Sequence, residues 1–285
     1  MTQTTHYRFK LGRTARSFDP RVPCLSALLA GKTTPPPPPA VDYTEKMPAD
    51  FGMMLNDSLG DCTCAAYYHA RQIWTFHSNG NEITEPNVDV QQMYVEACGY
   101  NPAVGGEGPG GNEQHVLTYL QQTGAPLGPQ GQQRDKILGF VEVDPRNIDD
   151  VKRTIYNSGV AYIGFNVPGN ILPPDGSPPQ TWTVDPSNQQ MLGGHAVVLP
   201  GYDANGAIVI SWGAKYVMTW EFFSKYVDEV YAITDAAWVH TVSPTLPADL
   251  SVDELAAQMH FLEADSIAPH DVPISTHNGV LVGTS

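Results

Sequence analysis

The 285-residue chain carries 30 Asp and Glu against 15 Lys and Arg, which gives a formal charge of −15. Nucleic acids and anionic membranes attract basic surfaces, so this charge argues against both as partners. Hydrophobic residues make up 41% of the chain and include 13 Tyr and 5 Trp, enough to bury the core of a globular protein.

Two features of the sequence predict a cytoplasmic location. Residues 1–16 hold no apolar run of the length that a secretory signal needs, and no later stretch approaches about 18 uninterrupted apolar residues. The four cysteines, at positions 24, 62, 64 and 98, are too few for a disulfide scaffold. We therefore expect free thiols in a cytosolic protein without a membrane span.

Residues 1–40 are expected to form an N-terminal arm. Five consecutive prolines at residues 35–39 run as an extended polyproline II segment, which makes a stiff connector. Ahead of them stands a short apolar patch of Leu25, Leu28 and Leu29. We expect this patch to pack on the body of the protein, rather than the arm forming a complete inhibitory domain.

The chain after the arm first shows helical patterns. No proline or glycine occurs from Cys62 to His77, and apolar residues recur there at helical spacing. Asp61, just before this run, stands where a helix N-cap is expected. Weaker helical patterns cover residues 90–97, 114–123 and 149–157.

The second half of the chain predicts antiparallel strands. Four runs rich in β-branched and aromatic residues cover residues 160–167, 195–202, 207–212 and 215–219. A turn sequence, Asp203-Ala204-Asn205-Gly206, separates the second run from the third. Between the first two runs, the polar and proline-rich residues 168–190 are expected to form a long surface loop.

Helices followed by strands predict an α+β fold with two lobes that face each other across a cleft. We expect residues 41–241 to form this domain, with a helical lobe at about 41–145 and a β-rich lobe at about 146–241. Residues 242–285 would be a C-terminal extension, with one amphipathic pattern at residues 252–262.

The candidate chemistry lies at the start of the long predicted helix and of the second strand. Cys62 stands in the first turn of that helix, where unpaired N–H groups and the helix dipole stabilise a thiolate. A nucleophilic thiol needs an imidazole as its base. His195 begins a predicted strand directly after Gly193-Gly194, so we expect it to be that base.

Five short segments carry motifs, in this order: Val41-Asp42-Tyr43, Gly60-Asp61-Cys62-Thr63, Gly110-Gly111, His195-Ala196-Val197 and Ser211-Trp212-Gly213. In their order and spacing they resemble motifs of the papain-like, or cathepsin-type, cysteine peptidases, over about residues 41–231. The resemblance implies the two-lobed papain-like fold, with the active site in the cleft between a helical and a β-rich lobe.

The resemblance also implies roles for individual residues. Cys62 matches the family's nucleophile and His195 its general base. Asn56, six residues before Cys62, stands where the family has its oxyanion-hole Gln. Gly110 and Gly111 match the pair that binds the substrate backbone, and Trp212 is also expected at the substrate site.

The chain departs from the family's pattern at three of these positions. Asn56 keeps the amide of Gln on a shorter side chain, and Thr63 replaces Trp. Ile210 stands in place of the Asn that orients the family's histidine. Either Ser211 or a polar residue of loop 168–190 takes over that role, or His195 has no orienting partner. We favour the second of these outcomes.

The identity of the nucleophile can be argued in two ways. Counting from Asn56 and Gly60 selects Cys62, whereas counting from the alanines of the helix selects Cys64. We favour Cys62 because the oxyanion donor and the nucleophile must share one turn. Cys24 and Cys98 are then expected to be structural.

The sequence thus predicts a thiol hydrolase, a peptidase or amidase, that acts on a peptide or protein substrate through an acyl-enzyme on Cys62. No metal ion or cofactor is implied, since no His and Cys cluster has zinc spacing. Two alternatives stay open. One is a pseudoenzyme that uses the fold as a binding module, and the other is a thiol acyltransferase or cross-linking enzyme.

Overall fold

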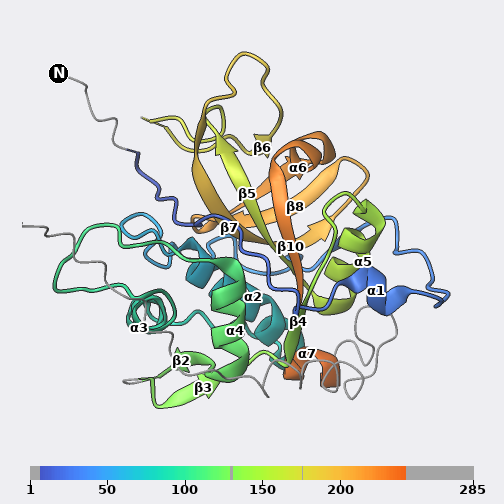
Figure 1. Cartoon of the computed structure of the whole chain (residues 1–285), viewed down its shortest axis with the longest axis horizontal. Helices are drawn as coiled ribbons and strands as arrows, with labels where there is room; N and C mark the ends of the chain where they lie inside the picture. Colours follow the sequence, from blue (N-terminus) through green and yellow to red (C-terminus); the bar gives the residue numbers. More distant parts are fainter. Residues whose placement is uncertain (1–6, 129–130, 175, 242–285) are drawn as a thin grey trace, which may run out of the picture.

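The computed structural model describes residues 7–128, 131–174 and 176–241. A group of helices and a mostly antiparallel sheet pack against each other, and the N-terminal arm runs between them (Figure 1). In this part of the chain no helix is both long and apolar enough to cross a lipid bilayer.

The helical part is built around one buried helix. Its elements are α2 (Cys62–Asn79), α3 (Asn87–Cys98), α4 (Glu113–Gln122) and the hairpin of β2 (Ala125–Leu127) with β3 (Gln133–Asp135). Helix α2 packs against the sheet and is buried along most of its length. It ends at Gly80, whose φ of 79° is in the left-handed region that favours glycine. Trp74 fixes α2 to the rest of the core by donating to the Ser158 carbonyl at 2.8 Å.

The large sheet has the strand order β4-β10-β5-β7-β8-β9-β6, with β1 paired to β7. All pairs are antiparallel except β6 with β9. The strands are β1 (Val41–Asp42), β4 (Gly139–Glu142), β5 (Ala161–Pro168), β6 (Thr181–Trp182), β7 (Met191–Tyr202), β8 (Gly206–Ser211), β9 (Ala214–Thr219) and β10 (Val227–Thr234). The associated helices are α5 (Ile148–Ser158), α6 (Trp220–Tyr226) and α7 (Ala236–Thr241).

The predicted α+β class is confirmed, and each helix and strand expected from the sequence is present with ends shifted by a few residues. The expected turn between β7 and β8 is also present. There the Asp203 N–H donates to the Gly206 carbonyl, and the Asp203 carboxylate accepts from the Asn205 N–H.

Three features of the second half were not predicted from the sequence. Strand β10 was not predicted, because Asp228 and Glu229 interrupt its apolar pattern. Strand β4 pairs with β10, so the sheet already begins at Gly139, ahead of the expected lobe boundary at residue 145. Loop 168–190 also contributes to the core, since Trp182 of β6 is fully buried.

The arm contacts the body at several places. Helix α1 (Leu25–Leu29) buries Leu25, so the expected packing of the apolar patch is confirmed. The proline segment is held by Arg153, which donates to the Pro35 carbonyl, and by Tyr202, which donates to the Pro38 carbonyl. The amphipathic pattern at residues 252–262 and the rest of the expected C-terminal extension lie outside the described residues.

Candidate active site

Cys62 is the first residue of α2 and lies against strand β7. Its side chain is buried, and its Sγ accepts a hydrogen bond from the Ala196 N–H at 3.4 Å. Ala196 follows His195 directly, so the structure brings the predicted nucleophile and base together from positions far apart in the chain. Cys64, two residues further along the helix, interacts with Cys98 instead. This arrangement supports Cys62 over Cys64 as the reacting thiol.

His195 is held between a serine hydroxyl and an indole ring. Its Nε2 lies 2.8 Å from Ser211 Oγ, and Trp212 stacks on the imidazole at 4.4 Å with 14° between the ring planes. The other ring nitrogen, Nδ1, is buried without a hydrogen-bond partner. When Nε2 carries the ring proton and donates a hydrogen bond to Ser211 Oγ, Nδ1 has a lone pair that can accept a proton.

Ser211 therefore orients His195, and the expectation that His195 lacks an orienting partner is wrong. Ile210 pairs across the sheet with Val198, and side chains alternate between the two faces of a strand. Val198 is three residues from His195, so Ile210 points away from the imidazole while Ser211 points toward it. The register of β7 and β8 shifts by one residue between Val198 and Gly201. This shift lies on the far side of Val198 from His195, so it does not change which face Ile210 and Ser211 occupy.

Asn56 lies in the loop before α2 and supports that loop in this state. Its Nδ2 donates to the Leu59 carbonyl and to Asp61 Oδ1, both at 3.2 Å. Asp61 occupies the N-cap position but makes no side-chain capping bond. Its carboxylate accepts from Asn56 instead of capping the helix as expected. The role of Asn56 as oxyanion donor stays a prediction.

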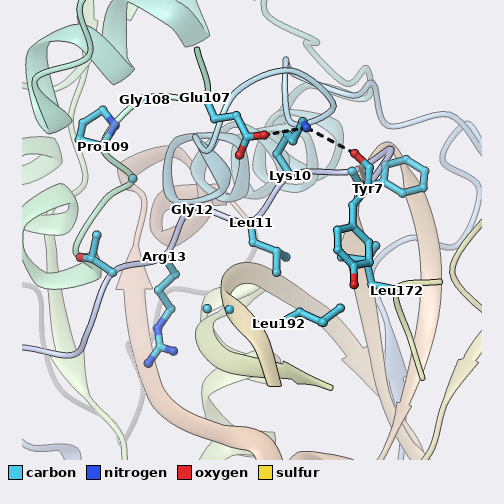
Figure 2. Close-up of a pocket in the computed structure, with 15 residues that line it drawn as sticks. Tyr7, Lys10, Leu11, Gly12, Arg13, Glu107, Gly108, Pro109, Leu172 and Leu192 are labelled. Atoms are coloured by element: carbon cyan, nitrogen blue, oxygen red, sulfur yellow. Dashed lines mark hydrogen bonds and ion pairs between the residues drawn. The ribbon is translucent and has the colours of Figure 1, made fainter. Parts of the chain in front are cut away.

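The arm runs past Cys62 and along the backbone of Gly111 and Gly194. Figure 2 shows Leu11, Gly12 and Arg13 of the arm in the pocket that they help to line. The Arg13 N–H donates to the Gly194 carbonyl at 3.1 Å, and the Thr14 N–H donates to the Gly111 carbonyl at 2.9 Å. The Gly111 N–H donates in return to the Gly12 carbonyl at 2.7 Å. The arm thus forms an antiparallel bridge with β7 and a parallel bridge with Gly111.

On the other side of Cys62 the arm covers Trp212. Phe9 packs on the indole with ring centroids 5.3 Å apart, and the indole N–H donates to the Lys10 carbonyl. The Lys10 N–H donates to the Asn56 carbonyl at 2.9 Å. Five of the predicted site residues therefore contact the arm directly, namely Asn56, Cys62, Gly110, Gly111 and Trp212.

Burial favours the neutral forms of both Cys62 and His195 while the arm is in place. Burial raises the pKa of Cys62 to about 12, although the thiol receives hydrogen bonds from the backbone of Ala196 and Gly12. Burial also lowers the pKa of His195 to about 3, and the nearby His69 and Arg13 add to this shift. The thiolate–imidazolium pair is therefore disfavoured while the arm is in place.

Sequence reasoning missed the residues by which the arm enters the cleft. Gly12 passes so close to the loop before α2 that an added Cβ would overlap the Gly60 carbonyl oxygen. Arg13 places its guanidinium among Glu113, Asp228 and Glu229. The available signal was the acidic pair Asp228-Glu229 within an otherwise apolar run, because a charge in a buried strand needs a partner.

Comparisons with other proteins place the fold. No protein-family model and no curated protein sequence matches the chain. Among solved structures, xylellain, a cysteine protease from Xylella fastidiosa, is 18% identical with a TM-score of 0.61, covering 83% of this chain and all of its own. Procathepsin B from Trypanosoma congolense is 12% identical with a TM-score of 0.51, covering 80% of this chain and 86% of its own.

A third similar structure is the proform of Amb a 11, a cysteine protease and ragweed pollen allergen. It is 15% identical with a TM-score of 0.50, over 73% of this chain and 68% of its own. At these identities the likeness concerns the backbone arrangement. The chain therefore has the fold of the papain-like cysteine proteases, as the sequence motifs predicted.

Proposed function

We propose that this protein is a papain-like thiol hydrolase, a peptidase or amidase, described here in a latent form with its arm across the active site. The observation that carries the proposal is the pairing of Cys62 with the strand of His195, whose Nδ1 has no partner while Nε2 bonds to Ser211. A thiol at a helix start beside an oriented imidazole is the arrangement that nucleophilic catalysis requires.

In the proposed reaction Cys62 Sγ attacks the carbonyl carbon of an amide as its proton passes to His195 Nδ1. The resulting oxyanion would be stabilised by Asn56 Nδ2 and by the Cys62 N–H, which has no acceptor within the first turn of α2. The C–N bond then breaks, and His195 returns the proton to the leaving amine. Water, deprotonated by His195, cleaves the thioester and restores the thiol.

The arm must leave the cleft before a substrate can bind. It occupies the backbone of Gly111 and Gly194 and buries Cys62, so substrate and arm compete for the same surface. Removing the arm also restores water to the thiol and the imidazole, which favours their charged forms.

An epoxysuccinyl thiol probe tests the proposal on the full chain and on Arg13→Ala, which weakens the hold on the arm. We expect one probe per molecule of the variant, mapped to the peptide that contains Cys62. Cys62→Ser should abolish labelling of this peptide and amide hydrolysis, whereas Cys64→Ser should keep both. Amide hydrolysis by Cys62→Ser, or equal labelling of the four cysteines in Arg13→Ala, would contradict the proposal.

The same experiment separates the two alternatives. A binding module would leave Cys62 unlabelled after the arm is loosened. An acyltransferase would label at Cys62 but would release product mainly when an amine is added in place of water. The hydroxyl of Ser211 beside His195 favours an enzyme, because the imidazole keeps the orienting partner that a decayed site would lack.

A further inference from the structure

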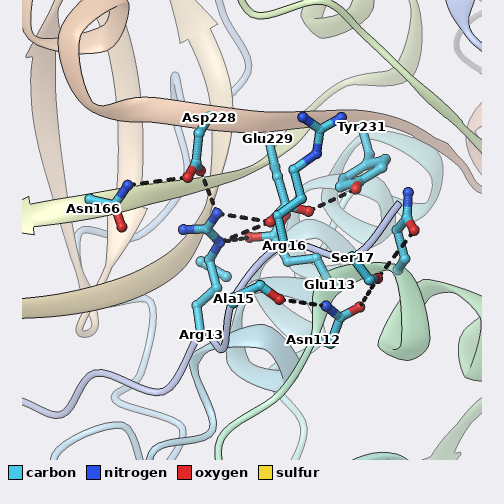
Figure 3. Close-up of polar contacts among 12 residues, drawn as sticks. Arg13, Ala15, Arg16, Ser17, Asn112, Glu113, Asn166, Asp228, Glu229 and Tyr231 are labelled. Atoms are coloured by element: carbon cyan, nitrogen blue, oxygen red, sulfur yellow. Dashed lines mark hydrogen bonds and ion pairs between the residues drawn. The ribbon is translucent and has the colours of Figure 1, made fainter. Parts of the chain in front are cut away.

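Arg13 of the arm fills a pocket lined by three carboxylates from two parts of the chain (Figure 3). Its Nη2 contacts Asp228 and lies 2.8 Å from Glu229 Oε1, both on β10. Its Nε lies 3.3 Å from Glu113 Oε1, at the start of α4. The side chains of Arg13, Glu113 and Glu229 are at most 3% exposed, whereas Asp228 is 42% exposed at the rim.

The surrounding residues hold these carboxylates in place. Tyr231 donates to Glu229 Oε2 at 2.8 Å, and Asn166 donates to Asp228 Oδ2 at 3.1 Å (Figure 3). Gly164 leaves the space that the guanidinium uses, since a Cβ there would overlap both Glu113 Oε1 and Arg13 Nε. The pocket is therefore built for a planar cation rather than assembled from flexible surface side chains.

Glu113 gives independent evidence that the pocket needs a cationic ligand. Both of its carboxylate oxygens are buried without a hydrogen bond, so the ion pair with Arg13 is what compensates the loss of water. Burial and the charge of Glu229 raise the pKa of Glu113 well above its usual range, and Arg13 opposes this shift. Without a cation, two carboxylates would face each other in a buried site.

The pocket opens from the cleft next to the reacting groups. The backbone of Arg13 bonds to Gly194, the residue before His195, and the preceding Gly12 N–H bonds to the Cys62 thiol. A polypeptide that binds along the same backbone groups would therefore direct one side chain into this pocket.

We propose that this pocket selects arginine in the substrate, and that Arg13 is its occupant in the latent form. The proposal rests on the proposed hydrolase function. An arginine of the substrate would make the same ion pairs with Glu113, Asp228 and Glu229. A leucine or citrulline would leave the two buried carboxylates without a positive charge. Lysine would supply the charge without the planar fork that contacts separate carboxylates.

The first test examines the pocket without using activity. Arg13→Ala empties the pocket in the full chain, and millimolar ethylguanidinium can then replace the lost side chain. We expect ethylguanidinium to raise the melting temperature of Arg13→Ala by several degrees but not that of the wild type. Ethylurea, which is similar in shape and uncharged, should have no such effect on either protein. The effect should disappear in Arg13→Ala with Glu229→Gln, which keeps an acceptor for Tyr231.

Arg13→Ala with Glu142→Gln is the matched control, because Glu142 pairs with Arg16 of the arm outside the pocket. Its response to ethylguanidinium should equal that of Arg13→Ala alone. Stabilisation that ethylurea reproduces, or that survives both Glu229→Gln and Glu113→Gln, would overturn the pocket assignment. Replacing Glu by Gln removes repulsion in the emptied pocket, so these variants are expected to fold.

The second test measures hydrolysis by Arg13→Ala of peptide amides that differ at one position. Arginine should exceed citrulline and leucine by at least about tenfold in kcat/KM, and Glu229→Gln should reduce this preference to less than about threefold. Hydrolysis without an arginine preference would overturn the pocket as a substrate site while leaving the hydrolase intact. Guanidinium-specific stabilisation without hydrolysis of any amide would instead refute the hydrolase and keep a guanidinium-binding pocket.

Discussion

Ser211 offers a hydroxyl to His195 where the papain-like motif would offer an amide. The sequence motif placed Ile210 at the orienting position, but the register of β7 and β8 turns Ile210 away and Ser211 toward His195. In the Arg13→Ala background, Ser211→Ala should lower kcat/KM at least about tenfold, because the imidazole loses the acceptor that fixes its tautomer.

Ile210→Asn is the informative comparison for Ser211. Because residue 210 faces away from His195, an added amide there should not improve hydrolysis, and it should not rescue the loss in Ser211→Ala. A gain in kcat/KM from Ile210→Asn would contradict the assignment of Ser211. So would unchanged activity in Ser211→Ala.

The four cysteines should differ in reactivity, with an order set by the arm. Cys98 is partly exposed, and a hydrogen bond from Cys64 lowers its pKa. Burial raises the pKa of Cys62 to about 12. In the wild type at pH 8, iodoacetamide should therefore modify Cys98 faster than Cys62, and in Arg13→Ala this order should reverse. Peptide mapping over time measures both rates, and rapid modification of Cys62 in the wild type would contradict the latent form.

At this scale the sequence could select Cys62 and His195 as candidates because each lies in a short local motif, and the structure brings the two motifs together. It could not predict the environment of Arg13, whose carboxylate partner Glu229 is 216 residues away along the chain. No local pattern in residues 7–17 distinguishes a segment that fills a cleft from an irregular tail. Only the acidic pair in β10, of which Glu229 is buried, pointed to a missing positive charge.

Among the elements, we expect the arm to have the largest effect on the proposed function. Its close passage at Gly12 requires a glycine, because a Cβ would overlap the Gly60 carbonyl oxygen. Gly12→Ala should therefore displace the arm and raise the rates of Cys62 labelling and of hydrolysis. The increase should exceed about tenfold, because a tethered segment competes for the cleft at a millimolar effective concentration.

Lys32→Ala is the matched control for Gly12→Ala, because Lys32 is an exposed residue of the same arm away from the cleft. It should leave both rates unchanged. Equal rates in wild type and Gly12→Ala would mean that the arm does not limit access to Cys62. The apolar patch in α1 was predictable from the sequence. The contact of residues 12–14 with Gly111 and Gly194 was not, because it depends on backbone hydrogen bonds that any sequence can make.

The helices and strands that carry regular apolar patterns were predicted with nearly correct ends. Strand β10 was missed for a physical reason, because Asp228 and Glu229 serve the pocket and thereby break the pattern of a buried strand. Strand β6 was missed because two residues are too few to show alternation. In both cases tertiary contacts decided the structure.

For the whole molecule, buried histidines should govern stability in mild acid. Burial lowers the pKa of His69 from 6.5 to about 4, and its Nε2 lies 3.1 Å from the Gly52 carbonyl. Native His69 thus stays neutral below pH 6.5 while the unfolded chain binds a proton, so stability is lost as pH falls from 6.5 to 4. The loss from this group reaches about 3 kcal/mol near pH 4.

Urea unfolding of wild type and His69→Gln at pH 7 and pH 4 isolates this contribution. Gln can still donate to the Gly52 carbonyl but does not titrate. Between pH 7 and pH 4, the unfolding free energy of the wild type should therefore fall by about 3 kcal/mol more than that of the variant. A constant difference across this range would contradict a neutral buried His69.

The direction of the arm in the cleft bears on how the latent form could be processed. The Gly12 N–H donates to the Cys62 thiol, and a trans peptide directs its N–H and C=O to opposite sides, so the Leu11–Gly12 peptide turns its carbonyl oxygen away from Cys62. The next carbonyl, that of Gly12, accepts from the Gly111 N–H. We therefore expect that a molecule in this state does not cut its own arm at either bond. Maturation by self-cleavage would then require an encounter between two molecules, so its half-time should shorten as the protein concentration rises, instead of being independent of dilution.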